Sequence, residues 1–333
     1  MQRHINRCMR DTRDTRRGTR AGTSAGLVLL AALLLLPASM QAAAQSDASG
    51  SGSGTGNGSS NGDGPALWHF EAGGRDVYLF GTIHLMKSGV SWFDRRIEEA
   101  LSEAETLVVE LDPTGLSRQE QRRVIRRFAL LPEGEKLSDT VSEERMERLM
   151  ELLSPMGIPR QTVERWEAWY AGLTVVGLSA RQAGFAAQHG VERRLLEEAQ
   201  ASGMEIRELE GFTEQMELFD GLSSSESVYF LADALEEHRK VAELFGKLKR
   251  YWMDQDLEAL EELVAESQKE NPSFYQTVYA ERNRDWAEAI EKMASEGSRE
   301  TGDLFVAVGT AHFVGDSSLP ELLRERGYEL TRH

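Results

Sequence analysis

The sequence predicts an α/β fold: a mainly parallel, mixed sheet with helical cover and two helical insertions. Short apolar runs alternate with amphipathic helical segments at both ends of the folded part. Two long stretches between them have helical periodicity and little strand signal. Strands that alternate with helices pair in parallel, because each helix returns the chain to the same end of the sheet.

The first element is a hairpin, followed by a helix and a strand. The runs "LWHFEA" and "DVYLFGT" flank Gly73 and Gly74, which tolerate the backbone of a tight turn. Next, "FDRRIEEALSEAE" places Ile97, Ala100, Leu101 and Ala104 at helical spacing, and the apolar run "TLVVELD" follows.

The same alternation returns twice. A helix at "VERRLLEEAQAS" stops at Gly203 and precedes a strand at "MEIRELE". At the end of the chain, "DLFVAVGTAH" predicts a buried strand, "SSLPELLRERG" a helix and "YELTR" a last strand. Ser318 and Glu321 have the spacing of a capping box at the start of that helix.

The helical insertions are expected near residues 116–190 and 226–298. Their aromatic residues, including Trp166, Trp169, Tyr251 and Trp252, are interpreted as core packing. A basic cluster spreads over one helix of the first insertion, and we interpret it mostly as a solvated face; it consists of Arg118, Arg122, Arg123, Arg126 and Arg127.

The first 45 residues are predicted to be a signal peptide. An Arg-rich start precedes an apolar run from Ala25 to Pro37, and Ala-x-Ala cleavage options follow near Ala43 and Ala44. The run is too short to span a bilayer comfortably. We therefore expect an exported protein, periplasmic or extracellular, with no transmembrane helix in the mature chain; an uncleaved anchor is the alternative. Residues 46–64 have the composition of a flexible Gly/Ser-rich linker, so the domain is expected to span 65–333.

Charge and cysteine content narrow the classes of partner. The chain has a net charge of −17; residues 1–45 carry seven Arg and two Asp, which leaves −22 on the remainder. Nucleic acid is thereby excluded as an expected partner. Cys8, the only cysteine, precedes the apolar run, so the mature chain is expected to lack disulfides and thiol chemistry.

The pattern Gly-Thr-x-His occurs twice, at Gly81 to His84 and at Gly309 to His312, each time directly after an apolar run. In an open α/β sheet, ligands bind beyond the carboxyl ends of the strands. Four predicted strands end in polar residues suited to such a site: His84, Glu110 followed by Asp112, Glu210, and His312. We therefore expect these side chains to converge on one crevice.

Two imidazoles and a carboxylate suit a divalent transition metal such as Zn, Mn or Co, with an open position for water. Glycine permits a sharp turn, and a threonine hydroxyl can hold a histidine ring or a bound water. The alternative is that Gly-Thr is simply a common sequence at the end of a strand and that each histidine has a structural role. We favour the site because both copies fall at equivalent places. The sequence contains no His-Glu-x-x-His helix, cysteine cluster or phosphate-binding loop.

Residues 65–333 resemble the TraB/GumN family, which is related to the TIKI proteases and to the TraB and PrgY pheromone-shutdown proteins. The likeness rests on five blocks in the order that the family shows them: "GTIHL", "LVVELD", "HGVERRLLEEAQASGMEIRELEGFTEQMELFDGL", "AERNRDWAEAI" and "FVAVGTAHFVGDSSLPELLRERGYEL". The resemblance implies an EreA/ChaN-like α/β core with helical insertions. In the TIKI branch it implies metal-dependent hydrolysis of peptide or protein substrates.

Carried over by position, the resemblance makes His84 and His312 metal or active-site residues, with Glu110 as the acidic member. Glu210, with Gln215 five residues on, falls in the family's Leu-Glu block, and Arg282 falls in its Arg-Asn block. The family often has Gly-Val-Asp where this chain has Gly190-Val191-Glu192, a change expected to affect only a secondary contact.

The expected mechanism is hydrolysis by water activated at a metal that His84, Glu110 and His312 hold. Glu110 or Glu210 would move the proton, and Arg282 would stabilise the anionic intermediate. Three alternatives remain open: a non-catalytic protein that sequesters a peptide or small ligand, a haem- or iron-binding envelope protein, and an envelope scaffold.

Overall fold

The computed structural model describes residues 64–112, 115–296 and 302–333. The predicted signal peptide and all but the last residue of the predicted linker lie outside the described residues. Within the described ranges, no helix combines the length and the apolar character that a membrane span requires.

A mixed six-stranded sheet forms the centre of the fold, in the order β4-β3-β5-β2-β1-β6. Its strands are β1 (Leu67–Ala72), β2 (Arg75–Thr82), β3 (Ala104–Val109), β4 (Glu205–Glu208), β5 (Asp303–Gly309) and β6 (Thr331–Arg332). β2, β5, β3 and β4 are parallel to one another, whereas β1 is antiparallel to β2 and to β6. The predicted α/β class with a mainly parallel, mixed sheet is confirmed.

The predicted hairpin is β1 and β2. Gly73 and Gly74 connect them with φ angles of 62° and 79°, which side chains with a Cβ rarely adopt. One boundary differs from the expectation: Ala104, placed in the preceding helix by its spacing, is the first residue of β3. The apolar run of the strand starts there, so strand pairing overrides the helical periodicity.

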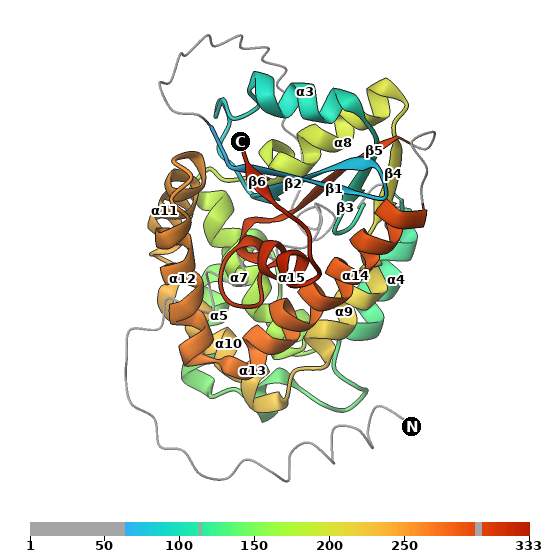
Figure 1. The fold of residues 1–333 in the computed structure, drawn as a ribbon. Helices are drawn as coiled ribbons and strands as arrows, with labels where there is room; N and C mark the ends of the chain where they lie inside the picture. The colour runs from blue at the N-terminus through green and yellow to red at the C-terminus, as the bar shows by residue number, and fades with distance from the viewer. Residues whose placement is uncertain (1–63, 113–114, 297–301) are drawn as a thin grey trace.

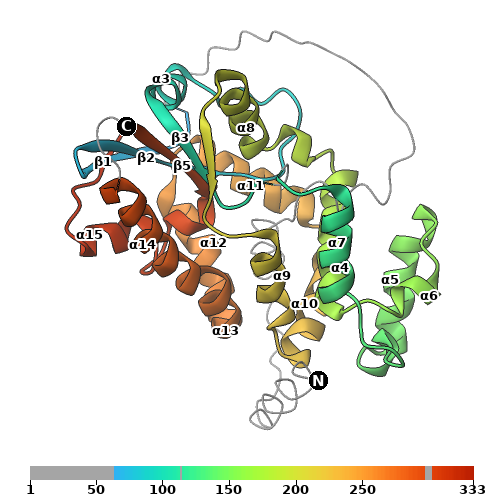
Figure 2. The same ribbon diagram turned by 90° about the vertical axis from the view of Figure 1, so that its right-hand side faces the viewer.

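Helices surround the sheet on both faces and beyond one end of it (Figure 1). They are α3 (Arg95–Glu103), α4 (Arg118–Phe128), α5 (Glu143–Leu153), α6 (Arg160–Val163), α7 (Ala168–Gln182), α8 (Val191–Ser202), α9 (Phe212–Asp220), α10 (Ser224–Glu237), α11 (Val241–Met253), α12 (Leu257–Glu270), α13 (Pro272–Tyr275), α14 (Glu281–Glu296) and α15 (Leu319–Glu325). A π-helical turn, Gln276–Ala280, joins α13 to α14. Figure 2 shows α4 to α7, α9 and α10 gathered to one side of the sheet.

The alternation of side chains along each strand divides the core between the two faces of the sheet. In β5, Leu304, Val306 and Val308 belong to the cluster that α14 and α15 complete, which includes Trp286 and Ile290. Phe305 and Ala307, on the opposite face, belong to the larger cluster that contains α3, α8 and most helices of the two predicted insertions. Burial on both faces explains why the strand is almost continuously apolar.

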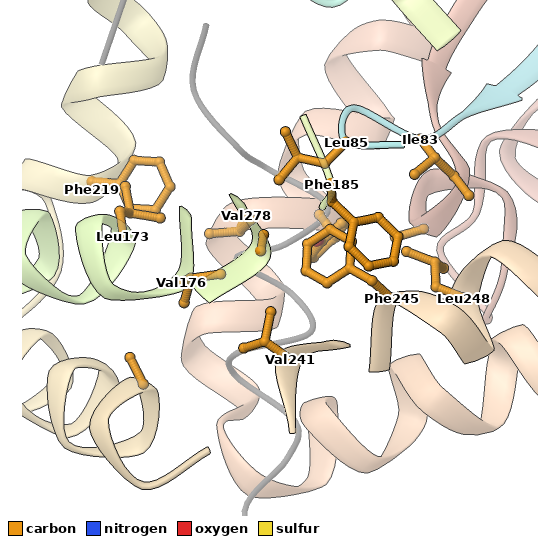
Figure 3. Close-up of a cluster of buried hydrophobic side chains, with 14 of the residues drawn as sticks. Ile83, Leu85, Leu173, Val176, Phe185, Phe219, Val241, Phe245, Leu248 and Val278 are labelled. Atoms are coloured by element: carbon orange, nitrogen blue, oxygen red, sulfur yellow. The ribbon is translucent and has the colours of Figure 1, made fainter. Parts of the chain in front are cut away.

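The residues on either side of His84 anchor its loop in the larger cluster. Ile83 and Leu85 are buried beside the rings of Phe185 and Phe245 (Figure 3). These two rings lie 5.1 Å apart between centroids. The loop after β2 is thus held by hydrophobic contacts from the segment that follows α7 and from α11, both distant in sequence.

The start of α15 differs from the prediction. Ser318 is the N-cap residue, as expected, but its side chain makes no capping hydrogen bond. Glu321 instead accepts a hydrogen bond from Nη1 of Arg324 at 2.5 Å. Its carboxylate therefore points along the helix, and the predicted capping box does not form.

Candidate active site at the carboxyl edge of the sheet

Four parallel strands deliver polar residues to the same edge of the sheet. Glu110 directly follows β3, and Glu210 lies two residues beyond β4. His84 lies two residues beyond β2, and His312 lies in a short 3-10 helix that follows β5. The carboxyl ends of neighbouring parallel strands meet at one edge, and the predicted convergence follows from this.

His84 forms an ion pair with Glu192 at the start of α8. Its Nδ1 lies 2.7 Å from Glu192 Oε1, and the Thr82 hydroxyl donates a hydrogen bond to the same oxygen. Burial disfavours the charged ring, but the Glu192 carboxylate outweighs burial and raises the pKa of His84 to about 9. Nε2 of His84 is buried and has no partner among the described residues.

His312 is held in a different protonation state. Its Nδ1 donates to Asn283 Oδ1 at 2.5 Å, and Arg282 Nη1 lies 3.4 Å from its Nε2. Burial, together with the nearby positive charges of Arg282 and His84, lowers its pKa well below the ordinary value. The ring is therefore neutral at physiological pH. Its Nε2 lies 3.8 Å from Glu110 Oε1.

Arg282 links the two carboxylates of the cluster. Its Nε and Nη2 donate to Glu210 at 2.8 and 2.5 Å, and Nη2 also donates to Glu110 Oε2 at 3.1 Å. Nη1 donates to the Val278 carbonyl at 2.9 Å. The other Glu110 oxygen accepts the Gly309 backbone N–H at 2.5 Å. Gly309, the glycine of the second Gly-Thr-x-His, thus orients the carboxylate through its backbone.

Glu210 and Gln215 form the side of the cluster nearest α9. Gln215 Nε2 donates to Glu210 Oε1 at 3.2 Å, which leaves the Gln215 side-chain oxygen buried and without a partner among the described residues. Burial raises the pKa of Glu210, although Arg282 opposes the shift. The carboxyl group can therefore hold a proton closer to neutral pH than an exposed glutamate.

Aromatic rings enclose the charged groups. The Arg282 guanidinium lies 4.4 Å from the centre of the Trp286 ring, and His312 lies 4.4 Å from Trp286 and 4.9 Å from Tyr279. The π-helical turn Gln276–Ala280 directly precedes α14, which carries Arg282 and Trp286. Such turns are rare and frequently occur at functional sites.

The cluster is more buried than the predicted crevice. The side chains of Glu110, Arg282 and His312 are 4%, 5% and 1% exposed, whereas those of His84 and Glu192 are 16% and 15% exposed. Approach from solvent is therefore easiest on the side of His84. Over the described ranges, no three His, Asp or Glu side chains are spaced to hold one metal ion.

The structure brings together His84, Glu110, Glu210, Arg282 and His312, the residues expected from the sequence. Asp112 lies beside Glu208, whose carboxylate accepts its backbone N–H at 2.6 Å. The threonine of the first motif binds Glu192 rather than a histidine ring. Glu192, expected to affect only a secondary contact, lies against the ring of His84, one of the candidate ligands.

Asn283 is the functional candidate that the sequence reasoning did not identify. It fixes the ring of His312, and its amide donates to the Ser317 carbonyl at 2.7 Å. Asn283 is 1% exposed. The signal that could have identified it is its position: an uncharged polar residue directly after the arginine, on the buried side of an amphipathic helix.

Comparison with known proteins finds a family model and relatives that match most of the chain. The model of the TraB/PrgY/gumN family matches residues 66–332. The uncharacterized protein YbaP of Escherichia coli (strain K12) is 25% identical over 252 residues, which cover 76% of this chain and 89% of the relative. YbaP of Shigella flexneri matches with the same identity and coverage. No solved structure matches the chain.

Proposed function

The chain belongs to the TraB/PrgY/gumN family, and on this premise we propose that it is a metal-dependent hydrolase of the cell envelope. Its substrates would be peptides or proteins, and its active site the cluster at the carboxyl edge of the sheet. The observation that carries the proposal is the gathering of two histidines, two glutamates and an arginine in one largely buried cluster. Clusters of buried titratable groups are common at functional sites, because catalysis requires the shifted pKa values that such clusters produce.

The donor types of the cluster suit a divalent ion such as Mn, Co or Zn, but its side chains are not spaced to hold one among the described residues, so binding would require them to move and His84 to release a proton. His84 has a buried ring nitrogen without a partner among the described residues, and His312 Nε2 lies near a Glu110 oxygen. His84, His312 and Glu110 would hold the ion, which would supply Lewis acidity and ease the deprotonation of water. Arg282 contacts two of these three donors, so we expect its contacts to change when an ion is bound.

The protein's own groups supply the remaining steps. Glu210 would take the proton from the attacking water and return it to the leaving amine, since burial raises its pKa toward neutrality; Glu110 is the alternative. Arg282 would stabilise negative charge on the substrate carbonyl oxygen. The unpartnered oxygen of Gln215 would accept an N–H group of the substrate.

Cleavage of a defined peptide mixture by the metal-loaded protein, followed by mass spectrometry, tests the proposal. We expect products from the wild-type protein and their loss in His84→Ala and His312→Ala. His69→Ala is the matched control, because His69 lies in β1 and pairs with Asp76 at 2.7 Å, outside the cluster. Unchanged cleavage in both cluster variants, with all proteins folded, would exclude the site.

One observation favours a second function, the sequestration of a peptide or small ligand without turnover. Both oxygens of Glu110 and of Glu210 already accept hydrogen bonds from the protein, so a water molecule would have to compete with these contacts to reach either carboxylate. Saturable peptide binding without products in the same experiment would support this function. Haem capture is less favoured, because both ring nitrogens of His312 contact protein groups.

A further inference from the structure

We propose that the outward face of α4 is a docking surface for an anionic lipid bilayer. We call it the arginine face, and it consists of Arg118, Arg122, Arg123, Arg126 and Arg127. The inference is independent of the active site, because none of these residues belongs to the cluster described above. Sequence reasoning interpreted them as a solvated face.

The arginines dominate the exposed side of the helix, which also carries Gln119 and Glu120. All five arginines are exposed, while Gln121 and Phe128 are buried on the opposite side. At 100° per residue, the arginines span about half of the helix circumference. The helix has 11 residues, so the face is about 16 Å long. Figure 2 shows α4 at the surface, in front of α7.

Much of this positive charge is not paired with an acidic side chain in the described part of the chain. Among the described residues, no salt bridge joins an acidic side chain to Arg118, Arg122 or Arg126, and Arg123 interacts with Glu120 only through their opposite charges. Glu120 is the one acidic residue of α4, and its carboxylate accepts hydrogen bonds from the backbone N–H and the hydroxyl of Ser117 in a capping box. By contrast, Arg193 and Arg194 of α8 are paired with Glu197 and Glu198.

The shape and charge of the arginine face fit a bilayer surface. Guanidinium groups bind phosphate oxygens in bidentate geometry, which favours phospholipid headgroups. The outward side of a single helix is convex, so it can lie against a flat surface but cannot enclose a peptide. Residues 46–333 carry a net charge of −22, and repulsion from anionic lipid is screened beyond about 8 Å at physiological salt. Attraction is thus confined to the part of the protein that touches the bilayer.

Co-sedimentation with lipid vesicles tests the inference. The chain used begins at Ser46, because the Arg-rich leader would itself bind anionic lipid; both the described fold and the family match begin after that point. Vesicles of phosphatidylcholine mixed with phosphatidylglycerol are compared with vesicles of phosphatidylcholine alone. We expect binding to the anionic vesicles only, weakening as salt is raised.

The variant R122Q/R123Q/R126Q should bind the anionic vesicles at least about tenfold more weakly, because each arginine contributes near an anionic surface. R122K/R123K/R126K, which keeps the charge, should retain most of the binding. R181Q/R193Q/R194Q removes the same charge from exposed positions elsewhere and should bind like wild type.

Three results would overturn the inference: equal binding by the R122Q/R123Q/R126Q variant, equal binding to uncharged vesicles, or loss of binding in the R181Q/R193Q/R194Q control. Tighter binding to duplex DNA or to an acidic protein than to anionic vesicles would also overturn it, by assigning the arginine face to another polyanion. Thermal unfolding of each variant checks that the fold is intact.

Discussion

Replacing Arg282 by methionine should destabilise the protein strongly, because it removes the cation that neutralises two buried carboxylates. The side chains of Glu110 and Glu210 are 4% and 8% exposed, and that of Arg282 is 5% exposed. Methionine fills part of the space but donates no hydrogen bond. Breaking a buried ion pair by removing one partner costs about 3–5 kcal/mol of the free energy of unfolding, because the remaining charge is buried without compensation.

Urea unfolding followed by circular dichroism measures this loss. Arg160→Met is the matched control, since the Arg160 side chain is 41% exposed where it pairs with Glu143 and Glu164, and its loss should change stability much less. Adding Glu210→Gln to the Arg282→Met variant should recover part of the loss, because one uncompensated charge disappears. Equal losses in Arg282→Met and Arg160→Met, or no recovery in the double variant, would refute the idea that buried charge pairing holds the cluster.

Further predictions concern pH and packing. The pKa of His84 is raised to about 9 in the folded protein. Its ion pair with Glu192 therefore contributes its full stabilisation below about pH 6.5, the pKa of an unfolded histidine, and this stabilisation is lost as pH rises through about 9. Glu192→Gln should flatten this alkaline decline in metal-free urea titrations, and an unchanged decline would count against the pair. The lowered pKa of His312 predicts that the protein becomes less stable in acid. Below about pH 6.5 the histidine binds a proton in the unfolded chain but not in the folded chain, so the free energy of unfolding falls as pH is lowered. His312→Gln should reduce that acid loss, and an equally steep loss would contradict the assignment. Gly172→Ala should cost about 1–3 kcal/mol by thermal unfolding, because the new Cβ would lie 2.9 Å from a phenylalanine ring of α10. Gly246→Ala meets nothing within 4 Å and should be neutral or stabilising, so similar shifts in the two variants would refute the packing argument.

The carboxyl edge of the sheet was predictable because it depends on local rules. Each apolar run ends at a polar residue, and parallel strands bring such ends together whatever the loops do. Glu110 and His312 could therefore be placed at this edge from the ends of the predicted strands alone. The repeated Gly-Thr-x-His marks the carboxyl ends of β2 and β5, which are adjacent in the sheet, with the two copies one residue apart in register.

The contact between His84 and Glu192 was not predictable, because it depends on how a distant helix enters the fold. The Val191 backbone N–H donates to the Ile83 carbonyl at 3.0 Å and fixes the start of α8 beside the loop that carries His84. A Cβ on Gly190 would lie 2.3 Å from the His84 carbonyl oxygen, so only glycine permits this approach. The sequence shows the glycine but not the surface that it meets.

The degree to which the cluster is buried could not be predicted from the sequence either. Polar residues after strands indicate an edge that ligands can reach, yet whether helices cover that edge depends on tertiary packing. Here Trp286 and the π-helical turn Gln276–Ala280 place Arg282 and aromatic rings over the carboxylates. The aromatic and charged residues of that helix were each visible in the sequence, but their common face toward the cluster was not.

The metal content of protein purified without chelator tests the central claim most directly. The account predicts a stoichiometric divalent metal ion by elemental analysis in the wild-type protein and in His69→Ala, and its loss in both His84→Ala and His312→Ala, with melting curves that show each variant folded. Wild-type protein without metal that also fails to bind added Mn, Co or Zn would contradict the account. Folded histidine variants that retain the metal would contradict it as well.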